Sequence, residues 1–111
     1  MSDIYGRDLV AGASFKQTST DTAVVLTAAS LLSASGNRAA AVHISCQTQT
    51  VRFGFGGATL TQGAGGLGHD LADKGSMYVE GAGTVKSMKV ISATNGSHGV
   101  LTITPFFEAG R

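Results

Sequence analysis

Short stretches of alternating apolar and polar residues, separated by glycine-rich turns, constrain the fold of this chain most. The clearest stretch is RAAAVHISCQ (38–47), where four apolar side chains alternate with their neighbours: Ala40, Val42, Ile44 and Cys46. A period of two is typical of a half-buried β-strand, because successive side chains point to opposite faces of a sheet. The stretch therefore predicts a strand with one face in the core and with His43 pointing outward.

The next stretch, TVRFGFGG (50–57), places Val51, Phe53 and Phe55 on one face of a second strand. We expect it to pair with 38–47 as a β-hairpin and its three apolar side chains to form the centre of the core. The glycines between them allow another segment to approach closely or the strand to bend.

The same reading predicts further strands over 22–29, 58–61, 76–81, 85–93 and 100–107, with a long glycine-rich loop over 62–75 and a turn over 94–99. The run 23–34 could instead form a short amphipathic helix, because periodicity does not settle so short a run. Pro105 cannot donate a backbone hydrogen bond, so the end of the last strand is expected at a sheet edge or outside the sheet.

Short strands with frequent turns and no convincing long helix predict an all-β chain, folded as an antiparallel β-sandwich or a small barrel. Residues 1–21 mix charged and apolar side chains without a sustained period. We therefore predict an irregular N-terminal arm (1–21) followed by a β-sandwich domain (22–111).

Charge and hydropathy exclude several kinds of partner. The formal net charge is +1 and only 14 % of residues are charged, without a basic tract, so we expect no nucleic-acid binding. The longest apolar stretch, 23–34, is shorter than the roughly 20 residues that cross a bilayer, and Asp21 before it does not suit a signal peptide. We expect no membrane span and synthesis in the cytoplasm without secretion.

The residues that carry chemistry form no recognisable constellation in the sequence. His43, His69 and His98 are too far apart for metal-ligand spacing, so we expect no metal, cofactor, catalysis or small-molecule substrate. The single cysteine, Cys46, is expected to be buried and inert. An alternative is a small enzyme in which Asp70 orients His69 as a general base.

Several segments resemble small β-sandwich structural proteins of tailed phages: SLLSASGNR, RAAAVHIS, VRFGFG, GLGHDLADKGS and KVISATNGSHGVLTITPFFE. The opening MSDIYGRDLV and the length are similar to those of the staple-type capsid decoration proteins of epsilon-like short-tailed phages (podoviruses). The resemblance implies a jelly-roll-like fold and no catalysis. It also implies a homodimer in the virion that binds the outer surface of the major capsid protein lattice and bridges neighbouring subunits.

The apolar residues of the predicted arm are the candidate contacts with the capsid: Ile4, Tyr5, Leu9, Val10 and Phe15. The same side chains could equally pack against the protein's own sandwich. A second hypothesis is a carbohydrate-binding or host-contacting module of the virion, such as a tail or spike accessory. The absence of Trp and the presence of only two Tyr leave few aromatic side chains for stacking a sugar.

Overall fold

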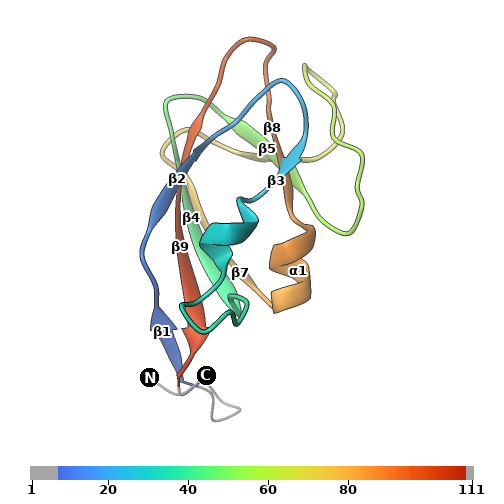
Figure 1. Ribbon diagram of the computed structural model, residues 1–111. Helices are drawn as coiled ribbons and strands as arrows, with labels where there is room; N and C mark the ends of the chain where they lie inside the picture. The colour runs from blue at the N-terminus through green and yellow to red at the C-terminus, as the bar shows by residue number, and fades with distance from the viewer. Residues whose placement is uncertain (1–7, 110–111) are drawn as a thin grey trace.

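The computed structural model describes residues 8–109 and contains two antiparallel β-sheets (Figure 1). The first sheet consists of β1 (Leu9–Ala11), β2 (Phe15–Thr18), β9 (Val100–Glu108), β4 (Ala41–Gln47) and β7 (Ser76–Glu80). The second consists of β3 (Val24–Val25), β8 (Lys89–Ser92), β5 (Val51–Gly54) and β6 (His69–Leu71). The predicted all-β sandwich fold is therefore confirmed.

The strands follow the order of a jelly roll. β1 and β2 pair with successive parts of β9, so together they act as one interrupted strand, which makes eight strands within residues 8–109. The first then pairs with the eighth, the second with the seventh, the third with the sixth and the fourth with the fifth. These four pairs alternate between the two sheets, as in a long hairpin wrapped into a sandwich.

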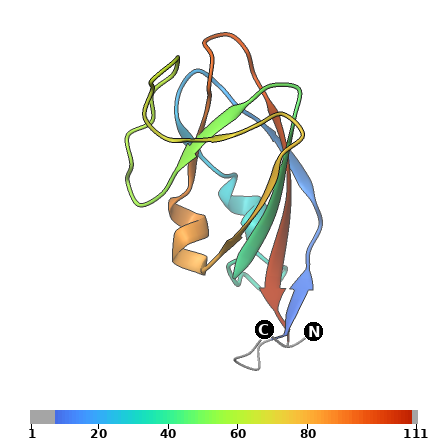
Figure 2. The same ribbon diagram turned by 180° about the vertical axis from the view of Figure 1, so that it is seen from behind.

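The prediction of an irregular arm over 1–21 is wrong for the described part of that segment. β1 and β2 form the edge of the first sheet, in a register that pairs Leu9 with Glu108 and Phe15 with Ile103. These strands are only three and four residues long, which is too short for a period to be recognised in the sequence. β1 and the end of β9 lie together at one end of the molecule in both views (Figures 1 and 2).

The placement of Pro105 also differs from the prediction, since it lies within β9, between two neighbouring strands. Its partner on β4 is Val42, and its carbonyl accepts a 2.7 Å hydrogen bond from the Gly12 amide on the other side. The N–H and C=O of one strand residue point the same way, so the missing donor faces the interruption between β1 and β2. The proline is tolerated in a central strand because its neighbour is broken there.

The expected hairpin between 38–47 and 50–57 does not form. β4 pairs with β7 and β9 in the first sheet, whereas β5 pairs with β6 and β8 in the second. The short connection between them begins at Thr48, which has a φ of 81° and whose amide donates to the Asp73 carboxylate at 2.9 Å. β4 is paired on both sides with strands far away in the sequence, β7 and β9. The alternation of residues within β4 does not indicate these partners.

Two short helices replace parts of the predicted strands. A 3-10 helix, η1 (Ala28–Leu31), follows the two residues of β3, so neither the strand expected over 22–29 nor the alternative amphipathic helix over 23–34 forms at its expected length. α1 (Ala82–Ser87) occupies the start of the expected strand 85–93, because Val85 and Met88 are buried at helical spacing. The expected strand 58–61 is absent from the described chain, while β6 lies inside the predicted loop.

The core lies between the sheets and is centred on β4, β8 and β9. Its fully buried side chains include Ile44, Val90, Leu101 and Ile103. Of the three residues expected at its centre, Val51 is buried, whereas Phe53 and Phe55 are half-buried and pack against its margin. The second sheet covers one part of the first sheet, and η1 and α1 cover the rest (Figure 1).

Candidate binding site

The three predicted contact residues that the structure describes, Leu9, Val10 and Phe15, do not gather on one surface. Ile4 and Tyr5 lie outside the described residues. Leu9 is half-buried on β1 and Phe15 packs against the core from β2, whereas Val10 is 54 % exposed. Among the described candidates, Val10 is the one that presents a largely exposed apolar side chain.

His69 and Asp70 do not act on one another, because they are consecutive residues of β6 and their side chains point to opposite faces. The His69 ring lies against Phe53, with 5.6 Å between ring centroids. The Asp70 carboxylate accepts a 2.7 Å hydrogen bond from Nε of Arg52 on the other face. The Asp70 carboxylate is therefore bonded to Arg52, and it does not orient the His69 imidazole as the general-base hypothesis requires.

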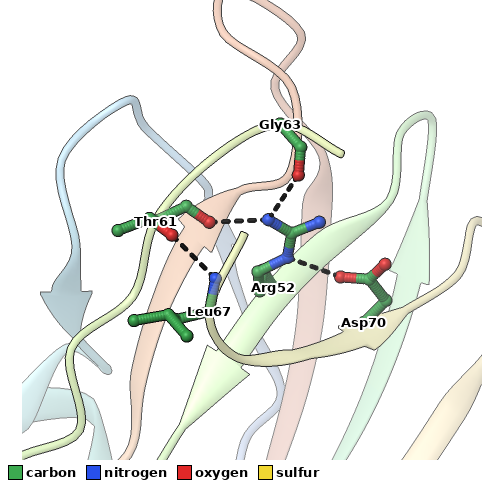
Figure 3. A network of polar contacts seen from close by, with 5 residues as sticks. All are labelled: Arg52, Thr61, Gly63, Leu67 and Asp70. Atoms are coloured by element: carbon green, nitrogen blue, oxygen red, sulfur yellow. Dashed lines mark hydrogen bonds and ion pairs between the residues drawn. The ribbon is translucent and has the colours of Figure 1, made fainter. Parts of the chain in front are cut away.

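Arg52 fastens the 55–68 loop to the outer face of the second sheet (Figure 3). Its side chain is only 8 % exposed, and Nη1 donates to the carbonyl oxygens of Thr61 at 2.6 Å and Gly63 at 3.0 Å. The loop closes on itself through the amide of Leu67, which donates to the Thr61 hydroxyl at 2.7 Å. The alternation of residues in β5 predicts that Arg52 faces solvent. In the structure, the 55–68 loop covers this side chain.

Glycines allow this loop to approach the sheet closely. A Cβ on Gly54 would lie 2.9 Å from Cδ2 of the buried Leu60, and one on Gly68 would lie 2.7 Å from Cγ of Arg52. Gly68 also has a φ of 123°, a conformation that L side chains rarely adopt. The close approach expected around the glycines of 50–57 is therefore present at Gly54.

A second polar network joins the two sheets through two buried serines. The Ser19 and Ser92 hydroxyls are 2.7 Å apart, and the Ser92 hydroxyl lies 2.8 Å from Nδ1 of His98. The Gly99 amide donates to the Ser19 hydroxyl at 2.9 Å. Although a serine beside a histidine has the parts of an activated nucleophile, both hydroxyls belong to fully buried residues, so a substrate has no access to them.

Asp21 fixes the neighbouring turn 94–97. Its carboxylate accepts hydrogen bonds from the Gly96 amide and the Gln62 side chain, both at 2.9 Å. The bond from the Gly96 amide, followed by that from Gln62, holds the pKa of Asp21 below its usual value. The carboxylate therefore acts as a backbone acceptor that ties this turn to the 55–68 loop.

Cys46 is fully buried, as predicted. Its Sγ lies 3.1 Å from the Gln49 carbonyl oxygen, and burial raises the pKa of the thiol. A buried, protonated thiol is a poor nucleophile. We therefore assign Cys46 to the core and not to a reactive site.

An apolar groove opens between η1 and α1, where the second layer changes from strands to helices. It has a volume of about 310 Å³, and its floor consists of core residues: Leu26, Leu31, Ala39 and Val85. Val25 and Leu32 form its rim and remain 48 % and 44 % exposed. Two short helices with alanines at 28 and 82 do not fill this space, so apolar surface stays open to solvent.

Two cations, Arg38 and Lys86, line the same groove, and no Asp or Glu among residues 8–109 lines it. Within residues 8–109 neither cation forms an ion pair, in contrast to Arg52. Sequence reasoning missed this site because its walls come from segments about fifty residues apart. The SLLSASGNR segment contains Leu32 and Arg38, but nothing in it indicates that they lie beside α1.

Comparisons of the chain with protein-family models, with curated proteins and with solved structures gave no match. Across residues 8–109, no three His, Cys, Asp or Glu side chains come together as ligands for a metal ion. The same part of the chain has no helix that is long and apolar enough to span a membrane.

Proposed function

We propose that this chain is a non-enzymatic decoration protein of a phage capsid, which binds the outer surface of the major capsid protein lattice as a homodimer. It bridges neighbouring subunits and so lowers the free energy of the closed shell relative to its pieces. Made in the host cytoplasm, it resides in the virion. The sequence resemblance to staple-type decoration proteins supports this proposal, and the jelly-roll strand order is typical of viral capsid and lectin domains.

The observation that carries the proposal is the exposed apolar surface beside the groove. Six large apolar side chains stay exposed within residues 8–109, and two of them, Val25 on β3 and Leu32 at the end of η1, lie together at the groove. Clustered apolar exposure of this kind indicates a surface that another protein covers.

Particles with and without the protein test the proposal. We expect the protein to copurify with intact capsids and particles that lack it to disassemble at a lower temperature, measured by light scattering during a temperature ramp. Adding the purified protein back is expected to restore the original disassembly temperature. Equal disassembly temperatures with and without the protein would contradict the bridging mechanism.

The role of the N-terminal segment needs a smaller deletion than the whole predicted arm. Removing residues 1–21 also removes β1 and β2, which leaves β9 as an unpaired edge. Removing residues 1–7 spares both strands and deletes Ile4 and Tyr5. Weaker capsid binding after this deletion would support these two residues as capsid contacts, and unchanged binding would exclude them.

One observation favours the alternative of a carbohydrate-binding or host-contacting virion module. Tyr78 on β7 is 49 % exposed and its ring lies edge-on to that of Phe106 on β9, with 6.0 Å between centroids. An exposed aromatic ring on a β-sandwich face can stack against a sugar. Binding on a glycan array that is lost in Tyr78→Ala would support this alternative, and an array without signal would contradict it.

A further inference from the structure

The groove between η1 and α1 combines an apolar floor with two cations that form no ion pair within residues 8–109, and these two features determine which ligand fits it. Its floor belongs to the core itself, since Leu26 and Val85 are each 2 % exposed. A large apolar side chain placed there would cover Val25 and Leu32 and complete the packing that η1 and α1 leave open. Removal of this surface from water would favour binding.

The positive charges at the groove indicate which kind of residue stands next to the apolar side chain in the ligand. Arg38 and Lys86 both line the groove, Lys86 in the last turn of α1. Since no acidic residue of the described chain lines the groove, a carboxylate that enters it is attracted by two cations and repelled by none of the described lining residues. A basic side chain in the same place would be repelled by both cations.

The edge of the neighbouring strand excludes one common mode of peptide binding. The Val25 carbonyl on β3 already accepts a hydrogen bond from the Gln17 side chain at 3.0 Å. Gln17 also accepts from the amide of Thr27 at 2.8 Å. With this part of the β3 edge occupied, a ligand gains its affinity from side chains in the groove and not from strand addition.

We propose that the groove binds an extended segment of the partner protein in which a large apolar side chain stands next to an aspartate or glutamate. The apolar side chain lies on the floor of the groove, and the carboxylate faces Arg38 and Lys86. The identification of the partner as the major capsid protein rests on the proposed function above, whereas the chemistry of the segment rests on the groove alone.

Capsids stripped of the protein provide the first test, with binding measured by cosedimentation of the purified full-length chain. Ala28→Leu combined with Ala82→Leu fills the groove and is expected to weaken binding at least about 30-fold, the effect of losing a central interface contact. The matched control is Ala29→Leu, which adds the same side chain to η1 outside the groove. Circular dichroism verifies that each variant is folded.

Charge reversal tests the second feature without altering the packing. Arg38→Glu combined with Lys86→Glu is expected to weaken binding about tenfold or more at low salt, with a smaller difference at high salt. Lys16→Glu, on the exposed side of β2, is the control and is expected to bind as the wild type does. Weaker binding of Lys16→Glu alone would assign the contact to the face of the first sheet and overturn the proposal.

The outcomes separate this proposal from the proposed function. Wild-type binding with unchanged binding of both groove variants overturns the groove proposal and leaves capsid binding intact. If the wild type does not bind capsids, the proposed function fails, and peptide titration followed by NMR still tests the groove. Shifts in the groove methyl groups with Ac-Gly-Asp-Leu-Phe-Gly-NH2 but not with Ac-Gly-Lys-Leu-Phe-Gly-NH2 support it; equal shifts with both, or shifts with octanoate alone, overturn it.

Discussion

Two arginines lie at two margins of the second layer and have opposite surroundings. Arg52 is covered by the 55–68 loop and donates to Asp70, Thr61 and Gly63. Arg38 is exposed beside the groove and has no ion-pair partner among the described residues. Arg52 is bonded within the fold, whereas Arg38 is available to the partner segment that we propose.

The same contrast holds for the packing around the two arginines. The 55–68 loop buries Leu60 against the second sheet, with glycines at the points of closest approach. η1 and α1 leave Val25 and Leu32 about half exposed. The closed margin contributes to stability through polar bonds and close packing, and the open, apolar margin is the one at which we propose binding.

The largest expected effect is at the closed margin. Arg52→Ala leaves the Thr61 and Gly63 carbonyl oxygens without their donor and is expected to lower the free energy of unfolding by about 2–3 kcal/mol. Asp70→Asn is the matched variant, with an expected loss below about 1 kcal/mol because the Asp70 side chain is 53 % exposed. Urea denaturation measures both. An equal loss for the two variants would show that the ion pair, and not the bonds to the loop, holds the segment.

Alanine substitution of two glycines compares the margins directly. A Cβ on Gly66 would collide with the Arg52 guanidinium and lie 2.5 Å from the Thr61 carbonyl oxygen, so Gly66→Ala is expected to cost about 1–3 kcal/mol. Gly83 lies in α1 with no heavy atom within 4 Å of such a Cβ, and Gly83→Ala is expected to stabilise the protein by about 0.5–1 kcal/mol. Changes of the same sign in thermal unfolding would contradict the distinction between a closed and an open margin.

Arg38→Gln is expected to change the free energy of unfolding by less than about 0.5 kcal/mol, because no described ion pair is lost. The measurement is the same urea denaturation as for Arg52→Ala. A loss as large as that of Arg52→Ala would mean that Arg38 is a structural residue, and the contrast between the two arginines would disappear.

The smallest effect concerns Asp21, which connects the loop to the 94–97 turn. Its pKa is lower in the folded protein than the usual 3.8, so its ionised form stabilises the fold above that value. This contribution is lost as the pH falls through the folded pKa. Asp21→Asn is therefore expected to lower the melting temperature slightly at pH 7, with the difference from the wild type shrinking below about pH 4. A difference that is independent of pH would exclude the carboxylate charge as the cause.

The sequence allowed the fold class and some strands to be predicted, because alternation survives wherever a strand has one face in the core. This is so for β4, β7 and β9, and it also explains the burial of Cys46 and the exposure of His43. The pairing of β4 and β5 was predicted wrongly because it depends on strands far away in the sequence. β1 and β2 were missed because pairing with β9, and not a local period, makes them strands.

The candidate site was harder to predict than the fold. The groove depends on how η1 meets α1, and the two cations become neighbours of an apolar floor only in three dimensions. The 55–68 loop likewise turns Arg52 from an expected surface residue into a buried one. In both cases, a segment that packs over a sheet decides which charged side chains remain exposed. The position of such a segment does not follow from the periodicity of the sequence.

A cryo-electron microscopy reconstruction of the intact phage particle tests the central claim most directly. We expect density for this jelly roll on the outer surface of the capsid, with the groove between η1 and α1 facing the shell and occupied by an apolar–acidic segment of the major capsid protein. A particle without the protein, or one in which the groove faces solvent while another surface makes the contact, would contradict it.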